Sequence, residues 1–164
     1  MIYIILLIMF VHTNIINYIC IVMIKCDSKY CGCLYFSASA LARIITKMAE
    51  EEFASTGLTP SYAFLVMSIN ANPGIQPKDL SAEMQLSPST ITRLIEKLEH
   101  KSLVERKTVG KTTEVYPTEK SVILGKTIKE SWMNFYKRYA EALGEDESKN
   151  LTAMIYSATK KLEE

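Results

Sequence analysis

The sequence predicts a mainly α-helical fold with one small β-hairpin. Apolar residues recur at helical spacing through most of residues 34–162, and the period changes to two only within 103–116. A capping residue followed by proline begins two of the helices. The 164 residues carry 19 Lys and Arg against 18 Asp and Glu. This balance excludes a strongly basic tail protein and a strongly acidic disordered chain.

The first 24 residues form an apolar leader without a charged side chain. A secretory signal carries Lys or Arg before its apolar stretch, and neither precedes this one. For a membrane span, the polar residues near the middle of the leader are costly in hydrocarbon. Besides a buried or signal segment, two interpretations stay open. Residues 1–24 are a spurious extension, because Met23 stands where charges begin, or they are a membrane anchor that leaves the rest of the chain in the cytoplasm. The second makes the chain a membrane-tethered sensor or interaction protein.

Residues 25–57 predict an N-terminal helix over Leu34–Ala54. All four cysteines precede residue 34, whereas a secreted disulfide framework distributes them through the fold, so a reducing compartment is expected. Cys31 and Cys33 lie at or just before this helix, where the dipole lowers thiol pKa, and are redox candidates unless they are incidental or packed thiols. The cysteine spacing matches no standard zinc site, so no metal or cofactor is expected.

Residues 58–117 predict a lobe of three helices and the hairpin. Thr59-Pro60 begins a helix that is apolar nearly all round and therefore central. Pro77 opens a short helix that Gln85 and Leu86 end, and Ser87-Pro88 begins the next. That third helix has a one-sided apolar stripe formed by Ile91, Leu94, Ile95 and Leu98. Strands are expected at 103–107 and 112–116, around a turn over 108–111 that Gly110 makes possible.

Residues 118–164 predict two further helices. Pro117-Thr118 begins a long helix that Gly144 ends. A helix of about 25 residues is ~37 Å long and overhangs so small a domain, so its stripe predicts contact with a second copy. The stripe consists of Leu124, Ile128, Trp132, Phe135 and Tyr139, and the last helix carries Leu151, Met154, Ile155, Ala158 and Leu162.

A short helix joined by a tight turn to a one-sided helix, followed by a hairpin, is a winged helix-turn-helix. The outer face of the helix after Ser87 is polar and positive, as entry into a major groove requires. Free backbone N–H groups at its N-terminal end attract phosphate, and Arg93 has the fork that grips guanine. The candidate DNA-binding residues are Ser87, Ser89, Thr90, Thr92, Arg93 and Lys97 on this helix, with Arg106, Lys107 and Lys111 in the hairpin.

Three segments resemble the winged-helix repressors of the MarR family: LTPSYAFLVMSIN (58–70), QPKDLSAEMQLSPSTITRLIEKLEHKSLVERK (76–107) and YPTEK (116–120). The resemblance implies a homodimer in which the helices of 25–57 and 118–164 interlock. Each lobe, 58–117, then recognises half of a pseudo-palindromic operator in double-stranded DNA. Ser87, Ser89, Thr90, Thr92 and Arg93 would face the DNA. The hairpin tip, TVGKTTEV, lacks the family's Asp-x-Arg pair, which leaves Lys111 as the wing contact.

The expected function is therefore that of a cytoplasmic, dimeric repressor of transcription. The resemblance implies release by a small molecule or by thiol oxidation at the junction between the lobe and the dimer helices, which changes the spacing of the two recognition helices. An enzyme is disfavoured, because the chain has two histidines and neither a Gly-rich phosphate loop nor a nucleophile elbow.

Overall fold

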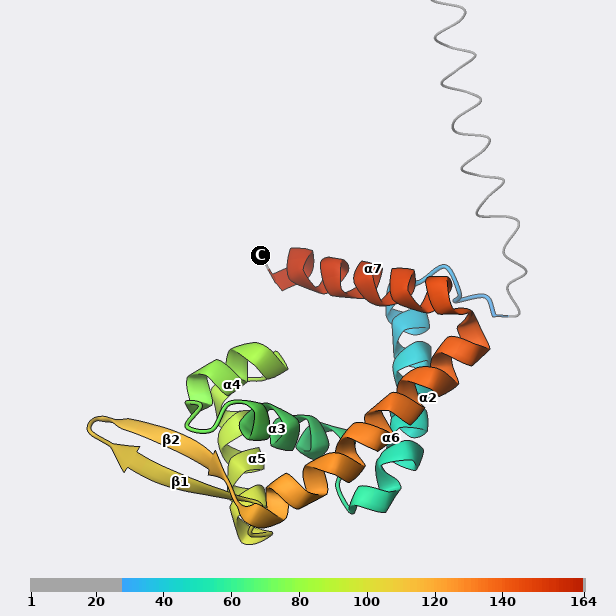
Figure 1. Cartoon of the computed structure of the whole chain (residues 1–164). Coiled ribbons are helices and arrows are strands. Elements are labelled where there is room, and N and C mark those ends of the chain that lie inside the picture. Colours follow the sequence, from blue (N-terminus) through green and yellow to red (C-terminus); the bar gives the residue numbers. More distant parts are fainter. Residues whose placement is uncertain (1–27, 164) are drawn as a thin grey trace, which may run out of the picture. The chain divides into compact units, whose positions relative to one another are not determined.

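A computed structural model describes residues 28–163 (Figure 1). The chain divides into two compact units between Ile44 and Ile45. The described elements are α2 (Leu34–Phe53), η1 (Ala54–Thr56), α3 (Pro60–Ala71), α4 (Pro77–Met84), α5 (Pro88–His100), β1 (Val104–Val109), β2 (Thr112–Pro117), α6 (Glu119–Leu143) and α7 (Glu145–Glu163). The predicted mainly helical fold with a small hairpin is confirmed. None of these helices offers the long uncharged stretch that spans a bilayer, and the predicted leader, 1–24, lies outside the described residues.

The smaller unit, described over residues 28–44, is a turn followed by the N-terminal half of α2. Ser37 fastens the turn to the helix: its N–H donates to the Cys33 carbonyl at 3.0 Å and its hydroxyl to the Cys31 carbonyl at 2.8 Å. Several large apolar side chains of this unit lie in solvent, among them Leu34, Tyr35 and Ile44.

Helix α3 lies at the centre of the larger unit, since it is apolar on every side. It contacts α4, β2 and α6, and Phe64 packs edge-on against Phe53 with ring centroids 5.4 Å apart. Thr59 and Pro60 begin the helix as predicted, although the Thr59 side chain forms no capping hydrogen bond. The residues of α3 that are fully buried are Ala63, Leu65, Val66 and Ile69.

Helices α4 and α5 form the helix-turn-helix, and both end in the same backbone motif. After α4, the Leu86 N–H donates to the Ser81 carbonyl; after α5, the Leu103 N–H donates to the Leu98 carbonyl. This is the Schellman arrangement, which usually places glycine in the left-handed conformation. Here Gln85 (φ 51°) and Ser102 (φ 55°) occupy that conformation. The sequence correctly predicted the break at Gln85 but gave no comparable signal at Ser102.

The hairpin pairs Val104 with Pro117 at its base and Val109 with Thr112 at its tip. Its turn is therefore Gly110-Lys111, shorter than the predicted 108–111, because Thr108 and Val109 continue the strand. Gly110 has a φ of +63°, the conformation that a two-residue hairpin turn requires. An isolated bridge between Ile75 and Val115 joins the hairpin to the segment after α3.

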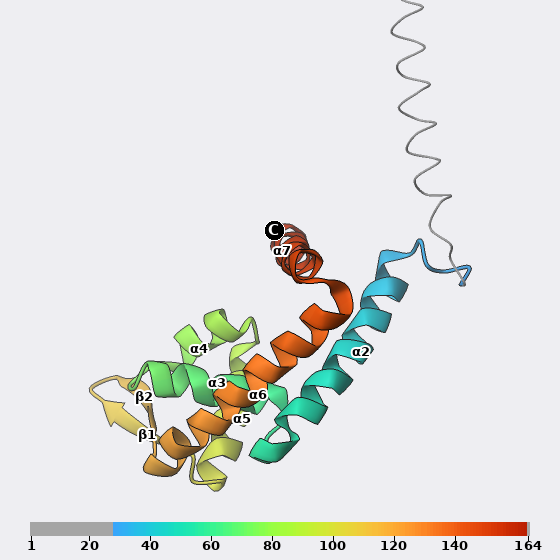
Figure 2. The same ribbon diagram turned by 45° about the vertical axis from the view of Figure 1, so that its right-hand side comes forward.

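Helix α6 leads from the hairpin to α7, which runs off at an angle after Gly144 (Figure 2). Of the predicted stripe, Ile128 and Phe135 are buried, Leu124 and Tyr139 are half-buried, and Trp132 is 43% exposed. One chain therefore covers only part of this stripe. Further large apolar side chains on α6 and α7 are exposed, namely Met133, Leu143, Met154, Ile155 and Leu162.

A buried polar pair fixes α6 on α3. The Asn70 Nδ2 donates to the Ser121 carbonyl at 3.0 Å, and the Ser121 hydroxyl donates to the Asn70 Oδ1 at 2.7 Å. Gly125, one turn further along α6, leaves the space for this amide, because a Cβ there would lie 2.8 Å from Nδ2. The second bond satisfies the hydroxyl of Ser121, a residue that is fully buried.

Thr118 joins the start of α6 to the end of α5. Its Oγ1 accepts from the Ser121 N–H at 3.2 Å as an N-cap and donates to the Ser102 carbonyl at 2.9 Å. Its own N–H donates to the Leu103 carbonyl at 3.1 Å. One residue thus caps one helix and fixes the end of another.

The substitution Thr118→Ala is expected to lower the free energy of unfolding by about 1 kcal/mol, because it removes a helix cap. Urea denaturation followed by circular dichroism, at one protein concentration, measures this change. Thr113→Ala is the matched control, since Thr113 is exposed on the hairpin and should cost less than about 0.5 kcal/mol. Equal midpoints for the two variants would contradict the role given to Thr118.

Candidate nucleic-acid interface

The outer face of α5 is held in solvent by the burial of the opposite face. Ile91, Ile95 and Leu98 are almost completely buried. Ser87, Ser89, Thr92, Arg93 and Lys97 are exposed, and Thr90 is half-buried. The structure therefore places all six predicted residues along a single helix, from the N-cap to the last turn, and five of them are exposed, as a surface that approaches a groove requires.

Three hydroxyl groups gather at the N-terminus of α5. The Ser87 Oγ accepts from the Thr90 N–H at 3.2 Å and lies 3.0 Å from the Ser89 Oγ and 2.8 Å from the Thr90 Oγ1. This confirms the predicted N-cap at Ser87. The remaining N–H groups of the first turn, with the positive end of the helix dipole, favour a negatively charged partner.

Arg93 and Lys97 extend the polar face along α5. Neither forms an ion pair with any residue in 28–163, and both side chains are exposed. Thr92 behaves differently, because its hydroxyl donates to the Pro88 carbonyl at 2.9 Å and so bonds its own helix. The two cations therefore keep their hydrogen-bond donors available for a ligand.

Arg106, a predicted contact residue, is paired within the protein. Its Nη2 lies 2.6 Å from the Glu99 Oε2, and its backbone N–H donates to the Glu99 Oε1 at 3.2 Å. Glu99 belongs to α5, so this double contact ties the base of the hairpin to the recognition helix. The sequence gave no indication of this pairing, since Glu99 looks like an ordinary solvent-exposed residue of a helix.

Lys107 is also neutralised locally. Its Nζ lies 2.7 Å from the Glu105 Oε1 and 4.7 Å from the centre of the Tyr116 ring. The hydrogen bond with Glu105 raises the pKa of Lys107 above its ordinary value. Tyr116 in turn donates to the Glu114 Oε2 at 2.6 Å, and this bond raises the pKa of Tyr116. Lys111, at the hairpin tip, is exposed and has no ion pair among the described residues.

The two redox candidates differ in state. Cys31 is disulfide-bonded, whereas Cys33 is an exposed free thiol immediately before α2. Cys33 alone therefore keeps the chemistry predicted for the pair within the described part of the chain. In that part, no three His, Cys, Asp or Glu side chains are placed to hold a metal ion.

The comparisons with known proteins agree with this fold. The model of the MarR family matches residues 58–108, the helix-turn-helix and the first strand of the hairpin. No curated protein matches the chain. The resemblance to MarR-type winged-helix regulators is thereby confirmed for the lobe.

Solved structures share the fold over most of the chain. MepR from S. aureus, in a complex with DNA, is 14% identical with a TM-score of 0.69, covering 78% of this chain and 97% of its own. CouR from Rhodococcus jostii, bound to p-coumaroyl-CoA, is 20% identical with a TM-score of 0.66, covering 80% and 95%. PcaV from Streptomyces coelicolor, in complex with its natural ligand, is 14% identical with a TM-score of 0.73, covering 83% and 98%.

The left-handed conformation of Gly110 is expected to determine how stably the two strands of the hairpin stay paired. Gly110→Ala places a side chain at a φ of +63°, which costs about 1–2 kcal/mol. Amide hydrogen exchange in β1 and β2 should then accelerate about five- to thirtyfold. Gly110→Asn is the control, because asparagine tolerates the left-handed conformation. Equal acceleration in both variants would show that the loss of glycine itself, rather than the conformation, is responsible.

Proposed function

We propose that the protein is a dimeric, cytoplasmic regulator of transcription that binds operator DNA and acts as a repressor. Helix α5 enters the major groove, with Arg93 contacting a base, and Ser87, Ser89, Thr90, Thr92 and Lys97 positioning the helix on the phosphates. The observation that carries the proposal is the polar face of α5, whose Arg93 and Lys97 have no partner among the described residues. The MarR family match and the DNA complex of MepR support it.

The hairpin is proposed to contact the flanking DNA through Lys111. Arg106 and Lys107, which are paired with Glu99 and Glu105, add little net charge. We propose that Arg106 and Lys107 chiefly hold the hairpin beside α5, while their remaining hydrogen-bond donors face the DNA backbone. No catalytic role is proposed, since the likeness is to a family of regulators.

The proposed dimer covers the exposed apolar residues of α2, α6 and α7. Trp132, Met133 and Leu143 on α6, and Met154 and Leu162 on α7, expose apolar area that a second copy would bury. Dimerisation presents two α5 helices to half-sites about one DNA turn apart, ~34 Å. A small molecule, or oxidation of Cys33, is proposed to change that spacing; solved structures of CouR and PcaV contain small ligands.

The substitution Arg93→Ala is expected to weaken binding to the preferred duplex by about 1–3 kcal/mol and to relax specificity at one base position. The duplex is selected from random sequence by the wild-type protein, and fluorescence anisotropy measures affinity. Lys97→Ala should weaken binding to all duplexes alike. It should also reduce the slope of log affinity against log salt concentration by about one. Lys126→Ala, which removes an exposed charge from α6, is the control. Unchanged affinity in Arg93→Ala would contradict the assignment of this face.

Oxidation of Cys33 is expected to weaken duplex binding if this thiol is the switch. Peroxide treatment of the wild-type protein should then lower the affinity measured by anisotropy, while Cys33→Ser remains insensitive. If this thiol is the switch, alkylation of Cys33 should also be faster than that of a free model thiol. Slow alkylation together with a peroxide-insensitive affinity would leave a small molecule as the only proposed signal.

A further inference from the structure

A group of aromatic and basic side chains lies in the smaller unit, on the turn before α2 and the first part of that helix. Its members, called here the aromatic–basic surface, are Lys29, Tyr30, Tyr35, Phe36 and Arg43. All five are exposed, and Tyr30 and Tyr35 keep 53% and 80% of their surface in water. The candidate DNA-binding residues all belong to the larger unit, so this surface is separate from them.

Two ring contacts order this surface. The centroids of the Tyr30 and Phe36 rings are 5.7 Å apart, and the Lys29 Nζ lies 4.7 Å from the centre of the Tyr30 ring. The Tyr30 backbone is fixed as well, because its N–H donates to the Ser28 Oγ at 3.3 Å and its carbonyl accepts from the Cys33 N–H at 2.9 Å. Side chains that are ordered in advance lose little entropy when a partner binds.

Phe36 and Arg43 share one face of α2. They are seven residues apart, which corresponds to two helical turns. Leu34 and Leu41 are also seven residues apart, but they begin two residues earlier and therefore lie about 200° around the helix. The Leu34 face can then meet the second copy proposed above, while the Phe36 face stays in solvent.

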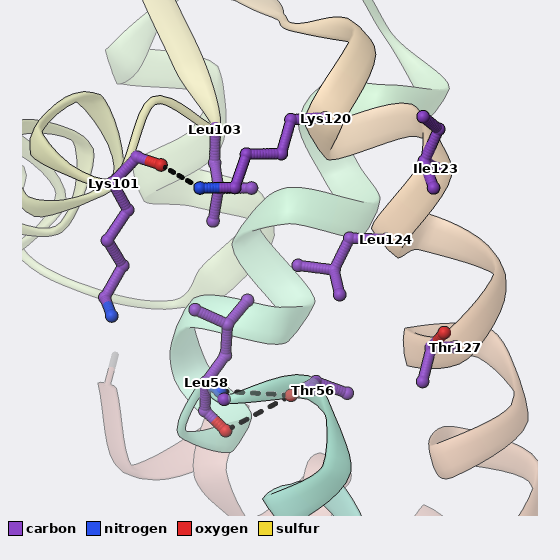
Figure 3. Close-up of a pocket in the computed structure, with 9 residues that line it drawn as sticks. Thr56, Leu58, Lys101, Leu103, Lys120, Ile123, Leu124 and Thr127 are labelled. Carbon is purple, nitrogen blue, oxygen red and sulfur yellow. Dashed lines mark hydrogen bonds between the residues drawn. The ribbon is translucent and has the colours of Figure 1, made fainter.

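The cations of the aromatic–basic surface are available to a partner. The described part of the smaller unit contains no Asp or Glu. Neither Lys29 nor Arg43 forms an ion pair within the described part of the chain. Lys120 of the larger unit differs, because its Nζ donates to the Lys101 carbonyl at 2.8 Å (Figure 3). Exposed cations beside aromatic rings, with no acidic group nearby in the unit, favour an anionic partner.

The chain that precedes this surface indicates lipid as the partner. The apolar leader, residues 1–24, has no charged side chain, and only residues 25–27 separate it from the described chain. The polar residues near its middle disfavour a membrane span, whereas a segment that lies in the membrane interface keeps such groups close to water. Tyrosine is enriched at that interface, and Lys and Arg beside an apolar segment attract anionic lipids.

A second copy of the chain explains this surface less well. Twofold contacts in homodimers set the same patch of both copies against each other. Such a contact through the aromatic–basic surface would bring the same cations together, with no acidic residue of the described unit to separate them. An anionic membrane meets both requirements, since it neutralises the cations and takes the rings out of water.

We propose that the aromatic–basic surface binds the anionic lipid surface of a membrane, and that it acts together with the leader. The inference goes beyond the proposed function, because it assigns a regulator of transcription to the cytoplasmic face of a membrane. A single weak anchoring signal gives only marginal binding, so stable attachment takes two. Tyr30, Tyr35 and Phe36 lie among the lipid headgroups, and Lys29 and Arg43 contact lipid phosphates.

Sedimentation of the full chain with vesicles tests the proposal. The vesicles consist of phosphatidylcholine, either alone or mixed with phosphatidylglycerol. Wild-type protein should bind the mixed vesicles about tenfold or more tightly than the neutral ones at low salt, and added salt should reduce this difference. Equal affinity for both kinds of vesicle would overturn the proposal, since the uncharged leader alone would then explain binding. Binding to neither would overturn it as well.

Charge substitutions locate the contact. Lys29→Gln and Arg43→Gln should each weaken binding to the mixed vesicles about fivefold, because each cation adds its own attraction to the anionic surface. Lys126→Gln, which removes an exposed cation from α6, is the matched control and should leave vesicle binding unchanged. Affinity for mixed vesicles that is unaltered in both surface variants would overturn the proposal.

Tyr35 tests the aromatic part of the surface, because so exposed a side chain can be replaced without disturbing the fold. Tyr35→Ser should weaken binding to both kinds of vesicle about fivefold, since the ring no longer leaves water. Tyr35→Trp should keep the affinity, and the emission of the added indole should shift to shorter wavelength when mixed vesicles are present. Emission that the vesicles do not shift would contradict the placement of this ring at the headgroups.

Sedimentation equilibrium without lipid separates the membrane from a second copy as the partner. The dimer dissociation constant should be the same in the wild type, Lys29→Gln and Arg43→Gln. Variants that weaken the dimer and leave vesicle binding unaltered would make this surface a subunit contact and refute the inference. Charge-dependent vesicle binding by a protein that binds no duplex would refute the proposed function and keep the membrane site.

Discussion

The structure depends on the attachment of α5 by one face alone. A helix of 13 residues is too short to be stable by itself in water. The burial of Ile91, Ile95 and Leu98 supplies the missing free energy, at about 1.5–3 kcal/mol for each fully buried side chain. Apart from the N-cap at Ser87 and the bond of Thr92 to its own helix, the opposite face is exposed. Its composition can therefore be set by a ligand instead of by the fold.

The distribution of ion pairs explains how a chain with a net charge of +1 keeps a positive face. Arg138 is held by Glu51 at 2.7 Å and by Glu52 at 3.0 Å, which fastens α6 to the end of α2, and these bonds raise the pKa of Arg138. Glu99 forms an ion pair with Arg106 in the same way. In these two cases acidic residues join elements, whereas Arg93 and Lys97 on the outer side of α5 form no ion pair within residues 28–163.

Local signals in the sequence predicted most of the fold. Ser87-Pro88 and Thr118 are caps whose effect acts within one turn, and the change of period at Leu103 marks the hairpin. The pairing of Thr108 and Val109 depends on the partner strand, so the turn was predicted too long. The left-handed conformation of Ser102 depends on the packing of Leu103, and no residue type signalled it.

The candidate site was predictable in position but not in chemical state. Helical spacing alone places Arg93 and Lys97 on the outer face of α5, and both are exposed there. The pairing of Arg106 with Glu99 joins residues on different elements, which no local pattern reveals. The disulfide-bonded state of Cys31 likewise has no local signal in the sequence.

The lobe is joined to α6 by two kinds of contact, and their difference determines what can move. Asn70 and Ser121 bond each other where Ser121 is fully buried, so separating them would leave unsatisfied polar groups at a cost of about 1–3 kcal/mol each. The bonds from Lys120 and Thr118 to the end of α5 are exposed, and water replaces them at little cost. Separating α6 from the end of α5 therefore costs less at these bonds than separating α6 from α3. Because α5 carries the polar face, these exposed bonds lie at the end of the helix that is proposed to bind DNA.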